Sequence, residues 1–144
     1  MTDLDPALTD LLATHTQGVL ATLRRNGRPQ LSVVTYTYDP DTGDIRASIT
    51  DGRAKTANLR RDPRATFEVT NSRGWGYAVA DGKAELSPVA ERPDDATVDE
   101  LIDVYRIARG SDHPDWDDYR TAMVREGRIV LTIHVEHVYG AVAP

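Results

Sequence analysis

The stretch that decides the fold is GVLATLRRNGRPQLSVVTYTYDPDTGDIRASIT, from Gly18 to Thr50. Its first part, Gly18–Arg25, is predicted to be a strand, and Asn26-Gly27 indicates a two-residue hairpin turn because both positions tolerate a positive φ. The return strand runs from Arg28 or Pro29 to Tyr38, and a second turn over residues 39–43 leads into a strand over residues 44–50. The chain therefore begins its sheet with antiparallel strands joined by tight turns.

Further strands and helices are predicted around this stretch. Alternating apolar residues indicate strands over Arg64–Asn71, Trp75–Leu86 and Arg128–Tyr139, with Ser72-Arg73-Gly74 as a turn. Helical spacing predicts helices after the N-cap Asp5, over Arg53–Arg61, over Asp95–Arg109 with Thr97-x-x-Glu100 as a candidate capping box, and over Trp116–Arg125. This order indicates a single α+β domain, residues 1–144, built mainly of β-structure as a six-stranded antiparallel barrel or half-barrel with peripheral helices.

Composition excludes several classes of protein. The 144 residues contain no cysteine, which excludes a disulfide scaffold, a thiolate metal site and a cysteine nucleophile. No apolar run approaches the ~20 residues that span a bilayer, and the acidic N-terminus lacks the basic and apolar regions of a signal peptide. We therefore expect a soluble cytoplasmic protein that binds no membrane.

The net charge of −6 is spread unevenly along the chain. Residues 81–118 carry twelve acidic and four basic side chains, a net of −8, whereas the remainder carries eleven acidic and thirteen basic ones, a net of +2. The overall acidity argues against nucleic acid as a partner, because that affinity comes mainly from neutralising phosphates. Within the basic remainder, five cations lie inside twelve residues and form either a solvated helix face or an anion site: Arg53, Lys55, Arg60, Arg61 and Arg64.

The strongest local signal is Asp51-Gly52-Arg53-Ala54-Lys55-Thr56, where a strand turns into a helix. Free backbone N–H groups and the positive end of the helix dipole point outward together at such a turn. Arg53 adds a planar fork, Lys55 a point charge and Thr56 a hydroxyl donor, and this combination suits a phosphate. The alternative is that Arg53 and Lys55 only cover a surface turn.

Polar side chains also follow the two neighbouring strands. They are Gln30, Ser32 and Tyr36 on one strand, and Arg46, Ser48 and Thr50 on the next. Such groups need partners, which would be water, a dimer partner or a polar heterocycle. Trp75 and Tyr77 add flat apolar surface, although both also suit a core. A phosphate site, a polar strand edge and aromatic planes together fit a flavin-like cofactor.

No motif for metal, nucleotide or nucleophilic chemistry is present. The sequence lacks G-x-G-x-x-G after a strand, G-x-x-x-x-G-K-[ST], H-E-x-x-H and G-x-S-x-G. His134 and His137 are the one close histidine pair, and their spacing of three predicts that they lie on opposite faces of a strand and cannot chelate one metal. We therefore expect neither a metal site nor hydrolase chemistry, and we nominate no catalytic residue.

Five stretches, in one order along nearly the whole chain, match a known family. They are GVLATL (18–23), NGRPQLS (26–32), RAKTANLRRDPRA (53–65), GWGYAVADG (74–82) and DWDDYR (115–120). With them the chain resembles the split-barrel flavin and deazaflavin oxidoreductases of the pyridoxamine 5'-phosphate oxidase-like superfamily. The resemblance is greatest to the actinobacterial branch that uses the deazaflavin coenzyme F420.

The resemblance implies a homodimer of six-stranded split barrels, with two cofactor sites in grooves at the subunit interface. In this family the R-x-K-[TS] segment, here Arg53, Lys55 and Thr56, holds the cofactor phosphate. The residues implied to line the cofactor ring are Gln30, Ser32, Val34 and Ser48, together with the Trp75 to Tyr77 region of the same or the other chain.

The resemblance further implies an F420-dependent oxidoreductase. Reduced coenzyme F420 would pass a hydride to a conjugated acceptor such as a biliverdin-like tetrapyrrole, a quinone or a nitro compound, while the protein supplies binding, orientation and water exclusion. The end of the chain, Val138 to Pro144, lacks the arginine- and tryptophan-rich segment of a true pyridoxamine 5'-phosphate oxidase, which argues against the oxidase reaction. The alternatives are an FMN-binding oxidoreductase of the same fold and a non-enzymatic cofactor or tetrapyrrole carrier. The acidic oligoglutamate tail of F420 would favour basic neighbours such as Arg60 and Arg61.

Overall fold

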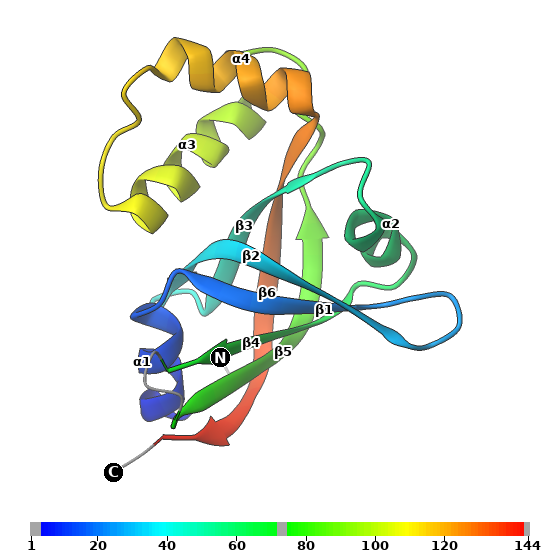
Figure 1. Cartoon of the computed structure of the whole chain (residues 1–144), viewed down its shortest axis with the longest axis vertical. Coiled ribbons are helices and arrows are strands. Elements are labelled where there is room, and N and C mark those ends of the chain that lie inside the picture. The colour runs from blue at the N-terminus through cyan, green and yellow to red at the C-terminus, as the bar shows by residue number, and fades with distance from the viewer. Residues whose placement is uncertain (1–3, 72–74, 143–144) are drawn as a thin grey trace.

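The computed structural model describes residues 4–71 and 75–142, in which six antiparallel strands close into a barrel in the order β1-β2-β3-β6-β5-β4 (Figure 1). The strands are β1 (Gln17–Leu23), β2 (Pro29–Asp39), β3 (Asp44–Thr50), β4 (Arg64–Thr70), β5 (Tyr77–Leu86) and β6 (Arg128–Ala141). The helices are α1 (Pro6–Ala13), α2 (Ala54–Arg61), α3 (Ala96–Arg109) and α4 (Trp116–Glu126). The predicted α+β split barrel is confirmed, whereas the predicted turn Ser72-Arg73-Gly74 lies outside the described residues.

The helices lie at different places around the barrel. α3 and α4 form an arm beyond one end of it, α1 lies at the other end, and α2 lies to one side (Figure 1). The arm has its own apolar cluster, in which Leu101 and Ile102 of α3 meet Tyr119 and Met123 of α4 and Val130 of β6. None of the described helices is long and apolar enough to cross a membrane.

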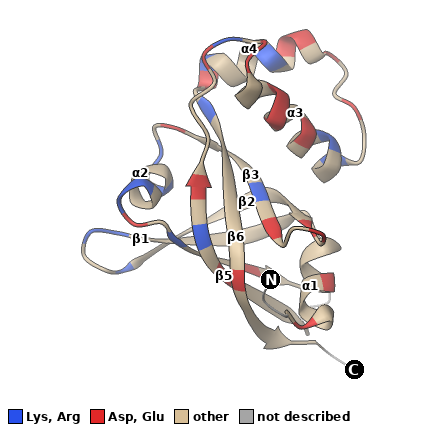
Figure 2. Cartoon of the chain, turned by 180° about the vertical axis from the view of Figure 1, so that it is seen from behind, with Lys and Arg blue, Asp and Glu red and all other residues tan. Residues whose placement is uncertain are grey.

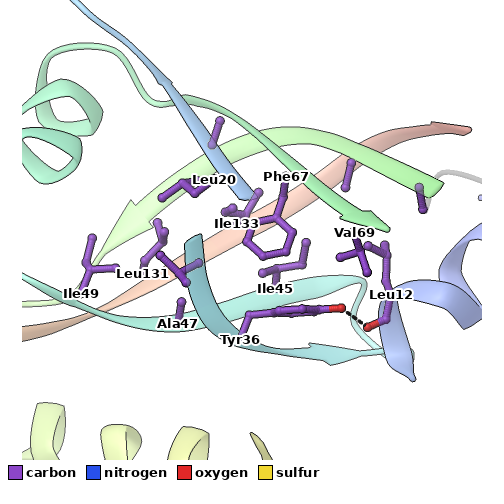
Figure 3. Close-up of a cluster of buried hydrophobic side chains, with 14 of the residues drawn as sticks. Leu12, Leu20, Tyr36, Ile45, Ala47, Ile49, Phe67, Val69, Leu131 and Ile133 are labelled. Carbon is purple, nitrogen blue, oxygen red and sulfur yellow. Dashed lines mark hydrogen bonds between the residues drawn. The ribbon is translucent and has the colours of Figure 1, made fainter. Parts of the chain in front are cut away.

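The barrel core is built from side chains at alternate strand positions. Tyr36 is fully buried in it, packs edge to face against Phe67 with 4.7 Å between ring centroids, and donates its hydroxyl hydrogen to the backbone oxygen of Leu12 (Figure 3). This hydrogen bond ties α1 to the barrel, and desolvation by burial raises the pKa of Tyr36. The prediction that Tyr36 belongs to a polar stripe is therefore wrong, because its ring fills the core and its hydroxyl has an internal acceptor.

The hairpin between β1 and β2 is confirmed, but its turn differs from the predicted one. Gly27 has a φ of 83°, and no described residue other than glycine has a positive φ, so Asn26 does not adopt the conformation that the two-residue turn requires. Instead, Gly27 N donates to Arg24 O and Arg24 N donates to Arg28 O, both at 2.9 Å. The loop therefore has three residues, with glycine at its left-handed position.

Helix starts follow their N-caps, with one departure from the prediction. Asp5 caps α1 by accepting a hydrogen bond from Ala7 N at 2.9 Å, as predicted. α3 is capped by Asp95, whose carboxylate accepts from Val98 N at 2.9 Å, while the Thr97 hydroxyl donates to a loop carbonyl. The predicted capping box at Thr97 and Glu100 is therefore wrong. The other element boundaries agree with the predictions to within two residues.

A β-bulge between β5 and β6 changes the faces on which two histidines lie. Lys83 pairs with His134 and Asp81 pairs with His137, with the register shift between Asp81 and Gly82. Lys83 and Asp81 share one face of β5, so both histidines lie on the same, solvent-exposed face of β6. The predicted opposite faces are wrong because one extra residue in β6 cancels the alternation. No group of three or more His, Cys, Asp or Glu side chains within the described residues is arranged to hold a metal ion.

The partners of His134 predict a pH dependence of stability. Its ring nitrogens lie 2.9 Å from Glu85 Oε1 and 2.9 Å from Asp44 Oδ1, and these hydrogen bonds raise the pKa of His134. Because the folded pKa exceeds the unfolded one, the stabilisation is fully present below about pH 6.5 and is lost as the pH rises through the folded pKa. His134→Gln should therefore lower the free energy of unfolding by at most about 1 kcal/mol in mild acid and by almost nothing in mild base.

Urea unfolding of the wild type and the His134→Gln variant, at about pH 5.5 and about pH 9, measures this difference. His15→Gln is the matched control, because among the described residues the His15 ring is hydrogen-bonded to the Thr14 hydroxyl and the Leu11 carbonyl and to no carboxylate. A cost for His134→Gln that is the same at both pH values would contradict the prediction.

Candidate functional site

A cavity of about 540 Å³ lies between the barrel and the arm. Its lining comes from β2 and β3 of the barrel, from the start of α2, from α3 and α4, and from the first residue of β6. The lining combines aliphatic, aromatic, hydroxyl and cationic side chains, and none of the described residues in it is acidic. Its size and composition are those of a small-molecule site.

Three cations converge where α2 begins. Arg53 is the N-cap of α2, Lys55 lies in its first turn, and Arg128 pairs with Thr50 in the β3–β6 register. The Arg53 side chain makes no capping hydrogen bond, and the backbone N–H groups of Ala54 and Lys55 have no acceptor among the described residues. Desolvation and, after it, the charges of Arg53 and Arg128 lower the pKa of Lys55. Concentrated like charge beside free amides at a helix start is an arrangement that binds anions.

Thr56 lies buried under this cationic end. Its hydroxyl donates to Thr50 O at 2.7 Å, which fastens the first turn of α2 to the end of β3. The hydroxyl hydrogen is therefore used within the chain, and Thr56 positions the turn that presents the free amides. Asp51, the acidic residue of the same turn, forms an ion pair with Arg60.

The four strand residues implied to line a ring separate into two groups. Val34 and Ser48 line the cavity, whereas Gln30 and Ser32 do not. The Gln30 side-chain oxygen accepts from Asn58 Nδ2 at 3.0 Å, and this partly buried contact holds α2 against β2. The Ser32 hydroxyl oxygen is buried and has no hydrogen-bond partner among the described residues.

Trp75 and Tyr77 lie at the far end of β5 from the cavity. Tyr77 begins β5 and pairs with Ala141, whereas the opposite end of β5, next to the arm, pairs with Leu131. Trp75 is 79% exposed and Tyr77 is 41% exposed. A single chain therefore does not bring these aromatic rings together with Arg53 and Lys55.

Several cavity residues were not predicted from the sequence. Arg128 lines the cavity and also pairs with Glu126 at 2.9 Å, and it reaches Lys55 only through the pairing of β3 with β6. Tyr105 and Arg109 line the cavity from α3. Arg109 carried a weak signal, because it is one of four bases in the otherwise acidic segment 81–118. No local pattern marks Arg128.

The barrel and the cavity define the class of the molecule, a split-barrel protein with a cationic helix start beside a cavity of mixed polar and apolar lining. Its sequence matches the pyridoxamine 5'-phosphate oxidase family over residues 4–141, and the chain belongs to that family. The family predicted from the sequence is thereby confirmed.

Relatives with assigned names place the family among redox proteins. The F420H(2)-dependent biliverdin reductase of Mycobacterium tuberculosis (strain CDC 1551 / Oshkosh) is 27% identical over 137 residues, which cover 95% of this chain and 87% of the relative. A solved F420 reductase has a TM-score of 0.67 at 20% identity and covers 94% of this chain and 98% of its own. A FAD-binding protein from Mesorhizobium loti has a TM-score of 0.66 at 20% identity, over 95% of this chain and 94% of its own. The names of these relatives refer to flavin or deazaflavin cofactors.

The hydrogen bond of Thr56 predicts the effect of removing its hydroxyl. Thr56→Val should lower the free energy of unfolding by about 1 kcal/mol, because the methyl group preserves packing while Thr50 O loses the shorter of its two hydrogen bonds and keeps the one from Arg53 N at 3.3 Å. Thr56→Ser keeps the hydroxyl and is the matched control for the hydrogen bond. Urea unfolding of the three proteins measures the effect, and equal stability of Thr56→Val and the wild type would show that this hydrogen bond contributes nothing.

Proposed function

We propose that this protein is an F420-dependent oxidoreductase that transfers a hydride from reduced coenzyme F420 to a conjugated small molecule, such as a biliverdin-like tetrapyrrole, a quinone or a nitro compound. The observation that carries the proposal is the convergence of Arg53, Lys55 and Arg128 on the free amides of α2, beside a cavity that has an aliphatic wall. The cations and amides suit the cofactor phosphate, and the aliphatic wall suits its ring. The relationship to a biliverdin reductase supports F420 as the cofactor.

The residues of this chain would bind and orient the reactants. When bound, reduced F420 supplies a hydride to an electron-poor carbon of the acceptor, and a proton from water completes the two-electron reduction. Arg53, Lys55 and Arg128 would hold the phosphate, while Val34 and Ile49 form an apolar floor that limits access of water. The arm covers the cavity from the other side.

Tyr119 lines the cavity without being a suitable proton donor. Its hydroxyl hydrogen is bonded to Leu101 O at 3.1 Å, and burial raises the pKa of Tyr119 to about 12. A general acid works best when its pKa lies near the operating pH. We therefore assign the protonation step to water.

An open groove beside α2 favours F420 over FMN, because F420 alone carries an acidic oligoglutamate tail. The groove has a volume of about 650 Å³, and the four arginines in its lining are Arg24, Arg25, Arg60 and Arg61. Figure 2 shows basic residues on α2 and on the hairpin between β1 and β2. Arg60 pairs with Asp51 and Arg61 donates to Leu23 O, so the hairpin arginines are the ones left for a tail.

Two alternatives differ in cofactor or in chemistry. An FMN-binding oxidoreductase of the same fold is favoured by the structural similarity to a FAD-binding protein. A non-enzymatic carrier of a cofactor or a tetrapyrrole would need the same cavity and no turnover. Binding titrations separate the first alternative from the proposal, and turnover assays separate the second.

Replacing Lys55 is predicted to weaken cofactor binding. Lys55→Ala should raise the Kd for F420 by about 10- to 150-fold, because a charge-assisted hydrogen bond contributes about 1.5–3 kcal/mol. Lys83→Ala is the matched control, since Lys83 is the only other lysine and lies exposed on β5 outside the cavity. Quenching of F420 fluorescence measures both Kd values.

The same titration with FMN tests the choice of cofactor. FMN binding that is tighter than F420 binding would overturn the proposal in favour of the first alternative. Oxidation of reduced F420 with a panel of acceptors then tests enzyme against carrier, and binding without turnover of any acceptor would favour the carrier. An unchanged Kd in Lys55→Ala would remove Lys55 from the site.

We also propose that the protein is a homodimer whose interface includes the outer face of β2. Leu31 and Val33 are 64% and 69% exposed there, side by side on one face of the strand. Large apolar side chains grouped on a solvent-exposed surface are typical of an interaction site. A second copy would also be the source of Trp75 and Tyr77 for the cavity, since the chain's own rings lie too far along β5.

Placing a charge on this face is predicted to dissociate the dimer. Leu31→Asp should shift the sedimentation of the protein at micromolar concentration from dimer to monomer, because a carboxylate buried at the interface has no partner. Ile107→Asp is the control, since Ile107 is a similarly exposed apolar residue on α3. A Leu31→Asp variant that remains dimeric would place the interface elsewhere, and a monomeric wild type would remove the proposal.

A further inference from the structure

The cavity carries a fourth cation at the end that lies away from α2. Arg109 lines it from the last turn of α3. In Figure 1, α3 runs from the side near α2 toward the opposite side, and Figure 2 shows from behind that the basic end of α3 faces away from α2. Because Arg53, Lys55 and Arg128 occupy the α2 end, the cavity is cationic at both ends.

Arg109 differs from the neighbouring arginine of the same helix. Arg106 Nε donates to Asp112 Oδ1 at 2.8 Å, and its guanidinium lies over the Trp116 ring. Arg109 has no hydrogen-bond or ion-pair partner in the part of the chain that the structure describes. Its charge is therefore not neutralised by any ion pair among the described residues.

The Arg109 guanidinium is nevertheless held in place. Its central carbon lies 5.5 Å from the centroid of the Tyr105 ring. Tyr105 is itself fixed by edge contacts with Trp116 and Tyr119, at 5.6 Å and 5.2 Å between centroids. Stacking on a ring face leaves the N–H edge of the guanidinium free to donate hydrogen bonds. A cation held in this way loses little rotamer freedom when it binds an anion.

The lining between the two cationic ends is uncharged and mixed in polarity. It combines apolar side chains such as Val34, Ile49 and Met123 with the hydroxyl-bearing side chains of Thr35, Ser48 and Tyr105. Such a cavity suits a conjugated ligand pair that carries polar groups on its rings and an anionic group at each end. The cofactor phosphate accounts for the α2 end only, which leaves the charge of Arg109 for the second reactant.

We propose that Arg109 is a binding residue for a carboxylate of the acceptor, so that the protein prefers conjugated acceptors with a carboxylate side chain over neutral ones. This inference rests on the proposed function, because it assigns the acceptor to the cavity that holds the cofactor. Arg109 also offsets the negative end of the α3 dipole, a structural role that would affect stability and not ligand choice.

The test compares biliverdin with its dimethyl ester, which has the same conjugated body and no carboxylate. Each is titrated against the wild type, Arg109→Gln, Arg109→Lys and the control Arg106→Gln, without cofactor, by absorbance. We expect the wild type to bind the acid about tenfold more tightly than the ester. Arg109→Gln should reduce acid binding to the level of the ester and leave the ester unchanged, while Arg109→Lys restores part of the preference and Arg106→Gln keeps it.

Three outcomes would overturn the inference: a wild type that binds acid and ester equally or binds neither, an Arg109→Gln variant that weakens both equally, and an Arg106→Gln variant that matches Arg109→Gln. Thermal unfolding of each variant separates a loss of fold from a loss of the carboxylate contact. F420 binding and turnover test the proposed function in separate assays. The acid and ester titrations contain no cofactor, so they still test the role of Arg109 if those assays fail.

Discussion

Closure of the barrel by β6 is the constraint on which the rest of the structure depends. β6 pairs with β3 on one side and with β5 on the other, so the chain must return to the barrel after the arm has left the end of β5. A shift of one residue would turn the apolar side chains of β6 outward, so one register is strongly favoured. That register buries Ile129, Leu131 and Ile133 and also sets Arg128 opposite Thr50. The pairing that completes the core therefore completes the cationic end of the cavity.

The electrostatics of the cavity follow from this arrangement. The exterior of the arm is acidic, as Figure 2 shows on α3 and α4, while the described lining of the cavity contains no acidic side chain. Lys55 is partly desolvated and close to Arg53 and Arg128, and these effects lower its pKa. The folded protein bears this repulsion at the α2 end, and a bound phosphate would relieve it. A site of this kind gains affinity from charges that the fold has already brought together.

Much of the fold and part of the candidate site follow from local patterns. Alternation predicted each strand to within two residues, and the strand–helix turn at Arg53 to Thr56 identified the start of α2 where three cations converge. The failures were of another kind. Asn26-Gly27 predicted a hairpin but the wrong turn length, and the bulge in β6 reversed the expected face of one histidine. Both features depend on how neighbouring strands pair. The residue propensities of a single strand do not specify that register.

The sequence by itself determined the six-stranded antiparallel barrel, the family and the basic turn, because hydrophobic alternation, turn residues and charge are local properties. Only the tertiary structure decided that Tyr36 is core, that Gln30 bonds to Asn58 and that Arg128 joins Lys55. It also decided that Arg109 shares a cavity with residues more than fifty positions earlier. These contacts join segments far apart in the chain, and barrel closure and burial select them in ways that no short stretch of sequence encodes.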